Sequence, residues 1–214
     1  GAIAPGYLAD FVIIDDFDHF NIEKVYKRGV LMVDHGVVAD FPVPEIDPYL
    51  VNRAHDTFHV ASLSAADFTD DRPHAVIGMV NGEITTTDGG YTDRIDVDYD
   101  ILKIAVIERH KNTHHIGLGY IKGYGLKKGA VATSISHDSH NIIVVGTSEA
   151  DMAAAVNREV ELNGGIVVWD GGQPIAEVPL AIAGIMSDEP LVDVNEKLET
   201  AKEKAFELGV SRGI

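Results

Sequence analysis

Short apolar runs joined by turn residues constrain the fold of this chain more than any other feature of its sequence. Residues 130–135 and 142–146 are rich in β-branched side chains, and the polar stretch His137–Asn141 separates them. Residues 165–178 repeat the pattern around a central Asp-Gly-Gly. Runs of this length between turn residues predict buried strands joined as hairpins. Because hairpins join antiparallel neighbours, we expect a mainly antiparallel sheet.

Other local signals predict the remaining elements. Residues 101–107 predict a further buried strand, and the alternation over residues 53–60 predicts another. Asn81-Gly82 predicts a two-residue type I′ turn between two strands. Ser148 opens a capping box at the start of one helix, and apolar residues at helical spacing after Pro190 predict a second. The chain therefore combines a sheet with two principal helices.

A proline-rich stretch divides the chain into two parts. Phe41–Pro48 holds three prolines in eight residues. Proline fixes φ and removes a backbone donor, so this stretch predicts a linker. We expect an α+β protein: a small β-sandwich fragment with its linker in residues 1–48, followed by an α+β domain in residues 49–214. The second domain would hold the mainly antiparallel sheet and the two principal helices.

The charge and the apolar content exclude several classes of partner. The chain has 34 acidic and 17 basic residues and a formal net charge of -17. This field repels phosphate backbones, so nucleic acids and anionic membranes are poor partners. No apolar run approaches the roughly 18 residues of a transmembrane helix, and no signal peptide is expected at the start. With no cysteine to form disulfides, a cytoplasmic location is the expectation.

The polar stretch His137–Asn141 is the first candidate site. Two imidazoles, a carboxylate, a hydroxyl and an amide lie together at the rim of the expected sheet. Such a cluster suits proton transfer or ligand binding. Aspartate, serine and asparagine are also turn residues that bond their own backbone. The residues alone are compatible with both interpretations, a functional site and a turn that only bonds its own backbone.

A second candidate site, Glu108–His110, follows the strand over residues 101–107. Three ionisable side chains at a strand end suit catalysis, but on composition alone a salt-bridged strand end is the favoured interpretation. The glycine-rich stretch Gly117–Gly125 does not add a nucleotide site. Lys122 stands where the Rossmann pattern needs its third glycine, and no Gly-Lys-Ser/Thr follows as in a P-loop.

Residues 1–40 resemble the end of the amidohydrolase superfamily. They carry Ile-x-Pro-Gly-x-x-Ala-Asp-Phe-Val from Ile3, followed by Val-x-x-x-Gly from Val25. The resemblance implies that the chain here leaves a metal-bearing (β/α)8 barrel and returns to a small β-domain. The family's metal ligands lie on that barrel, and no His-x-His occurs in this sequence. We therefore expect a fragment or an isolated domain of a longer enzyme.

The stretch from Glu108 to Asp188 resembles the C-terminal domain of bacterial and archaeal adenine deaminases. Its matching residues are Glu108–His110, Gly129-Ala130, His137–Asn141, Val145-Gly146, Asp151-Met152, Gly164-Gly165, Pro179-Leu180 and Ala183–Asp188. The His-Asp-Ser-His-Asn block is the most specific part. Ile185 is a departure, because leucine is expected there.

The resemblance implies a function for the longer enzyme. That function is hydrolysis of adenine to hypoxanthine and ammonia by hydroxide on a divalent metal, manganese or iron, held by the barrel. The expected partners are the missing barrel, adenine and further copies of the chain. This chain is expected to be inactive alone and to bind no catalytic metal. The candidate catalytic residues are His137, His140, Glu108 and His110, and the candidate substrate-binding residues are Asp138, Ser139, Asn141 and Arg109.

Two alternative roles remain for the domain. It could mediate oligomer contacts, with polar loops that only satisfy their own backbone. It could also be a separate binding module in which His137, Asp138 and His140 hold a divalent ion. Three ligands within four residues of one loop are less common than ligands from different strands. The first alternative is therefore the stronger competitor to an active-site role.

Overall fold

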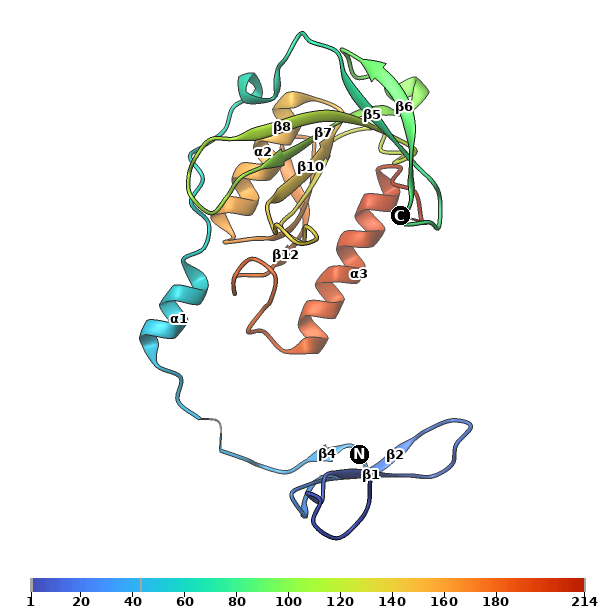
Figure 1. Cartoon of the computed structure of the whole chain (residues 1–214), viewed down its shortest axis with the longest axis vertical. Coiled ribbons are helices and arrows are strands. Elements are labelled where there is room, and N and C mark those ends of the chain that lie inside the picture. The colour runs from blue at the N-terminus through green and yellow to red at the C-terminus, as the bar shows by residue number, and fades with distance from the viewer. Residues whose placement is uncertain (1, 43, 214) are drawn as a thin grey trace. The chain divides into compact units, whose positions relative to one another are not determined.

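A computed structural model describes residues 2–42 and 44–213 and divides the chain into two compact units, the first ending at Ile46 and the second beginning at Asp47 (Figure 1). The first unit is an antiparallel sheet in the order β1-β2-β3-β4. Its strands are β1 Phe11–Ile14, β2 Ile22–Lys27, β3 Val30–Asp34 and β4 Val37–Val38. Arg28 and Gly29 join β2 to β3 with φ values of 48° and 78°, the left-handed conformations that a tight hairpin turn requires.

The second unit is built on one sheet in the order β12-β11-β9-β10-β7-β8-β5-β6. Its strands are β5 His74–Met79, β6 Thr86–Thr92, β7 Ile101–Ile107, β8 Ile116–Lys122, β9 Ala130–Thr133, β10 Ile142–Gly146, β11 Gly165–Asp170 and β12 Gln173–Pro179. Its helices are α1 Pro48–His55, α2 Glu149–Glu161 and α3 Leu191–Glu207, with short 3-10 helices η1 Ala65–Phe68 and η2 Val97–Tyr99. β5 pairs with β8 in parallel, and the other described pairs are antiparallel.

The long helices α2 and α3 lie on opposite faces of this sheet. Val167 packs in one apolar cluster with Met152 and Val156 of α2, and its neighbour Val168 packs in another cluster with Ala201 of α3. Successive strand residues point to opposite faces, so the two clusters mark two separate layers of core. The predicted α+β class with a mainly antiparallel sheet is confirmed. Among the described helices, none is long and apolar enough to cross a bilayer.

One predicted strand is wrong. Residues 53–60 do not form a strand, because Arg53–His55 belong to α1 and the residues after them have no regular structure. The side chain of Asp47 accepts a hydrogen bond from the Tyr49 amide, and Pro48 occupies the first helical turn. Proline is well suited to that position, so Pro48 begins a helix and the linker ends before it.

The type I′ turn at Asn81-Gly82 is also wrong, although the hairpin around it exists. β5 and β6 pair, but residues 80–85 form a longer connection between them. The Gly82 amide donates to the carbonyl of Gly213, 3.1 Å away. The connection is thus held by a distant part of the chain, which a dipeptide signal cannot reveal. Ser148 is confirmed as the N-cap of α2, with its side chain accepting from the Asp151 amide, but the Asp151 carboxylate accepts from the Ser148 hydroxyl, so the predicted capping box forms only in part.

Candidate functional site

The structure brings the two candidate stretches together at one rim of the sheet. β7 and β10 are antiparallel neighbours, and Ile107 pairs with Ile142. Glu108–His110 therefore leave β7 beside the point where His137–Asn141 enter β10. The sequence predicted each stretch separately, and the strand register places them side by side.

The stretch His137–Asn141 forms a tight loop with two residues in the left-handed region. Asp138 has a φ of 63° and His140 a φ of 48°. The His140 amide donates to the carbonyl of Ser136 at 3.0 Å, and the Ser139 amide donates to the carbonyl of His137 at 2.8 Å. Aspartate and histidine tolerate this conformation better than most residues. The loop therefore presents its side chains from a fixed backbone.

Arg109 ties the loop to two distant segments. Its guanidinium donates to the carbonyls of His140, Thr57 and Ala183. It also stacks over the ring of Phe58 at 4.3 Å. The residue is 2% exposed, and a buried guanidinium needs its donors satisfied. Arg109 thus positions the backbone of the loop, and its role in binding substrate remains a prediction.

His110 and Glu108 also fix backbone. The Nε2 atom of His110 lies 2.9 Å from the carbonyl oxygen of Ser139 and donates to it. Burial raises the pKa of the Glu108 carboxyl, but hydrogen bonds from the Thr113 hydroxyl and from the amides of His110, Thr113 and Lys111 outweigh it and lower that pKa to about 2. Glu108 is therefore a fixed anion near neutral pH, not a proton carrier.

The remaining candidate side chains face outward or lack partners. His137 has a side chain that is 98% exposed and lies 3.6 Å from the carboxylate of Asp138. Ser139 is exposed as well. His140 Nδ1 and Asn141 Oδ1 are buried, and neither has a hydrogen-bond partner among the described residues. Unpaired buried polar atoms are costly and call for a partner.

A shallow hollow lies at this rim. It has a volume of about 610 Å³ and is lined by Val106, Glu108, His114, His115, Ile116, Gly117 and Asn141. Glu108, His115 and Asn141 each lie two residues beyond Val106, Gly117 and Ile143, respectively, and Val106 pairs with both Gly117 and Ile143. These three polar side chains therefore share the sheet face that α3 partly covers. The hollow is an open surface and does not enclose a small ligand by itself.

Comparison with known proteins identifies the domain. The family model of the adenine deaminase C-terminal domain matches residues 78–213, more than half of the chain. The chain belongs to this family. The adenine deaminases of Dehalococcoides mccartyi strain 195 and Desulfatibacillum aliphaticivorans are each 39% identical to it across 98% of this chain. That of Nitratidesulfovibrio vulgaris strain DP4 is 39% identical across 100% of it. The chain spans 38% of the length of each of these relatives.

The adenine deaminase C-terminal domain contains a buried glutamate that sequence reasoning missed. Glu159 of α2 is fully buried, and neither carboxylate oxygen has a hydrogen-bond partner in the described part of the chain. Burial raises the pKa of Glu159 well above its ordinary value, and the nearby Ser134 hydroxyl and the charge of Arg109 oppose this without cancelling it. The spacing of Met152, Val156 and Glu159 was the available signal, because it places an acid on the apolar face of the helix.

The glutamate makes stability depend on pH. Below about pH 4.5, the ordinary pKa of a glutamate, Glu159 is protonated in both the folded and the unfolded state, and its burial then costs no charge. As the pH rises from there toward the raised folded-state pKa, only the unfolded state releases the proton, so the free energy of unfolding falls. Replacing Glu159 with glutamine removes this loss. A difference of one pKa unit between the folded and unfolded states is worth about 1.4 kcal/mol, and each kcal/mol moves the melting temperature of a domain this size by roughly 2–4 °C.

We expect Glu159→Gln to melt above the wild type at pH 8 and near it at pH 4, as measured by circular dichroism. Glu203→Gln is the matched control, because Glu203 lies exposed on α3 and the same chemical change there should shift neither melt. A Glu159→Gln difference that stays constant between pH 4 and pH 8 would show that folding does not raise the pKa of Glu159.

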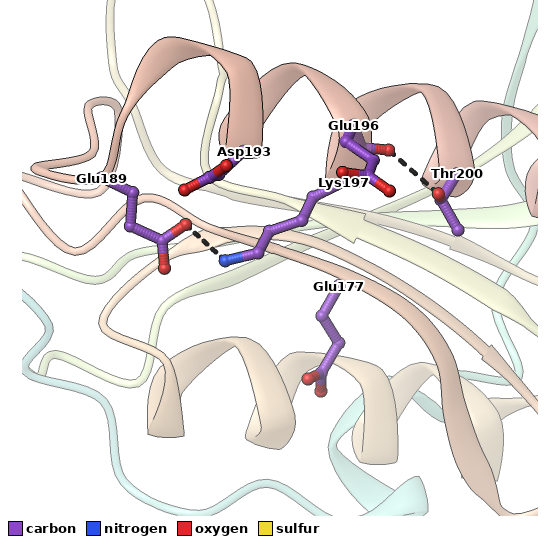
Figure 2. Close-up of a pocket in the computed structure, with 6 residues that line it drawn as sticks. All are labelled: Glu177, Glu189, Asp193, Glu196, Lys197 and Thr200. Atoms are coloured by element: carbon purple, nitrogen blue, oxygen red, sulfur yellow. Dashed lines mark hydrogen bonds and ion pairs between the residues drawn. The ribbon is translucent and has the colours of Figure 1, made fainter.

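An acidic hollow elsewhere in the domain is a weaker candidate. Figure 2 shows its lining residues, Glu177, Glu189, Asp193, Glu196, Lys197 and Thr200. Lys197 pairs with Glu189, and Glu177 pairs with Arg158 of α2. These ion pairs link α3 and β12 to their surroundings. Across residues 2–42 and 44–213, no three His, Asp or Glu side chains converge as a metal site, so the described residues do not fit the metal that the family resemblance implies.

Proposed function

We propose that this chain is the C-terminal region of an adenine deaminase, which converts adenine and water to hypoxanthine and ammonia. The observation that carries the proposal is the family match over residues 78–213 together with relatives named adenine deaminase that align along nearly all of the chain. Because the chain spans 38% of those relatives, the remainder of such an enzyme would supply the metal ligands. The residues of this chain would then act beside that site.

The loop at His137–Asn141 is the part of the chain that we assign to the active site. Release of ammonia requires a proton on the departing nitrogen, and an imidazole can deliver one near neutral pH. His137 is exposed, and His140 has a ring nitrogen without a partner. Arg109 and His110 hold the carbonyls of His140 and Ser139. They would act as positioning residues that fix where the two imidazoles point.

A structural role is the competing proposal, and one observation favours it. The charged groups of Glu108 and Arg109 are satisfied largely by backbone atoms of this chain. A rim that only stabilises its own loops could serve assembly between copies of the protein. The two proposals differ in what happens to turnover when the loop histidines are removed.

The proposed activity is tested on the full-length parent protein. With manganese or iron supplied, it should release equal amounts of hypoxanthine and ammonia from adenine, at a rate on the order of 10 per second, which is ordinary for enzymes. Chromatography measures hypoxanthine, and a coupled assay measures ammonia. Guanine is the control substrate, because oxygen already occupies the ring carbon at which adenine loses its amine. A pure, folded parent that releases no ammonia from adenine with either metal would refute the proposal.

A further inference from the structure

One row of residues crosses the central strands on the face of the sheet that carries α3. Thr133 of β9 pairs with Ile166 on one side and Ile143 on the other. Ile143 pairs with Val106 of β7, and Val106 pairs with Gly117 of β8. Directly paired residues point to the same face. We call Ile166, Thr133, Ile143, Val106 and Gly117 the open row.

The β7 and β8 end of the open row is exposed, at Val106 and Gly117, whereas Ile166, Thr133 and Ile143 are half-buried and Ile166 packs in the cluster beneath α3. α3 contacts β11 and β12, which lie at one side of the sheet. Val106 is 36% exposed, and Ile135, just beyond the end of β9, is 52% exposed. An apolar groove of about 320 Å³ between α3 and β9 and β11 continues this surface. A central sheet face with apolar residues normally packs against a second layer.

The two glycines of β8 on this face have no explanation within the chain. A Cβ added at Gly117 would meet one atom within 4 Å, the Val106 carbonyl oxygen at 3.9 Å. At Gly119 it would make ordinary contacts of 3.6 Å. Neither glycine has a positive φ. Glycine weakens a strand, and in strands it often marks the close approach of another backbone. The two glycines therefore indicate that a polypeptide outside the described structure approaches β8 closely.

We propose that the open row is the docking surface for the part of the parent polypeptide that lies outside this chain. This inference rests on the proposed function only for the existence of that parent. The chain spans 38% of its relatives, which leaves about 62% (100 − 38) of each relative as further polypeptide. That polypeptide is covalently joined to this chain in each parent molecule, so its effective concentration at the open row is high.

The area of the open surface favours a tethered partner over a second copy. Four strand spacings of about 4.8 Å, with two same-face residues along each strand, give a surface of roughly 250 Å². A stable complex between separate proteins buries about 800 Å² on each partner. Docking of the rest of the parent polypeptide requires less buried area, because that polypeptide is joined to this chain and does not have to bind from solution.

The open row also ends at the candidate site. Val106 is two residues from Glu108, and Ile143 is two residues from Asn141, on the same face of the sheet. A body packed on the open row would therefore border the hollow and cover the rim. The buried, unpartnered oxygen of Asn141 lies at this border.

Cysteine labelling tests the docking directly. The chain has no cysteine of its own, so Val106→Cys introduces one thiol on the open row. A maleimide should label it at least tenfold more slowly in the full-length parent than in the 214-residue chain, which corresponds to about 1.4 kcal/mol of docking free energy. Mass mapping of the peptide that contains residue 106 measures the rate in each protein.

Ile84→Cys is the matched control. Ile84 is 102% exposed in the connection between β5 and β6, and it should label at the same rate in both proteins. Equal rates for Val106→Cys in both proteins would overturn the proposal. Slow labelling of Val106→Cys already in the 214-residue chain would overturn the proposal too. If labelling slows further as the protein concentration rises, a second copy covers the open row. If it does not depend on concentration, residues 2–46 cover the row. None of these outcomes depends on deaminase activity.

A second variant tests the role of Gly117. Gly117→Val should leave the melting temperature of the 214-residue chain unchanged or raised, because its side chain meets open space there and valine suits a strand. In the parent that also carries Val106→Cys, it should restore fast labelling, because the side chain would hold the docked body away. Retained protection in the Gly117→Val parent would show that nothing approaches β8 closely.

Discussion

Replacing His140 with asparagine in the full-length parent is expected to lower the turnover of adenine by about 100- to 10,000-fold, the usual contribution of a general acid or base. Asparagine keeps the left-handed φ of 48° at this position, which alanine would strain. The carbonyl that Arg109 holds also stays in place. The variant therefore removes the imidazole with little change to the loop, and its melting temperature should remain close to that of the wild type.

His137→Ala should separate chemistry from folding in the same way. The imidazole is 98% exposed and has one weak contact, with Asp138 at 3.6 Å. Removing it costs the fold little, so a lower rate constant would report a role in the reaction. Steady-state rates of ammonia release and thermal melts, measured on the same preparations, give both quantities for each variant.

His35→Asn is the matched control for His140→Asn. His35 also has a φ of 48° and lies exposed in the first unit. It should keep normal turnover. If both loop variants turn over adenine normally below their melting temperatures, the assignment of His137 and His140 to catalysis is wrong, whatever those temperatures are. An early melt with normal turnover would add that the imidazoles stabilise the loop, by about 1 to 3 kcal/mol if hydrogen bonds are lost.

Elements specified by neighbouring residues could be predicted from the sequence. The hairpin around Gly171-Gly172, the strand over residues 101–107 and the helix that begins after Ser148 all formed as expected. Each depends on interactions within a few residues: left-handed glycines, a β-branched run, and a side-chain cap. The pattern of apolar residues then fixes which face each element buries.

Interactions between distant segments could not be predicted in this way. The guanidinium of Arg109 reaches carbonyls 52, 31 and 74 residues away, so its neighbours in sequence say nothing of its partners. The adjacency of Glu108 and the His137–Asn141 loop follows from the pairing of β7 with β10, which short-range signals do not determine. The same holds for Glu159, whose burial depends on what packs against α2.

The isolated 214-residue chain is expected to show no turnover of adenine, even with manganese added. In the described residues no three possible ligands converge on one point. Without a metal site, nothing lowers the pKa of water toward the value near 7 that zinc-bound water reaches in carbonic anhydrase. The hollow at the rim is also open to solvent, so it cannot exclude water from a bound purine.

Ammonia release by the purified chain, compared with the parent at equal molar concentration, measures this difference. A circular dichroism melt of the same sample shows that the chain is folded, so that inactivity cannot be blamed on unfolding. The chain carrying His140→Asn is the internal control, because trace activity from a contaminating deaminase would not respond to it. Activity at about one per cent of an ordinary enzyme rate of 10 per second, abolished by His140→Asn, would mean that residues 2–213 hold a complete active site. The metal ligands would then have to be assembled by a rearrangement of this chain, and the role proposed for the rest of the parent would fail.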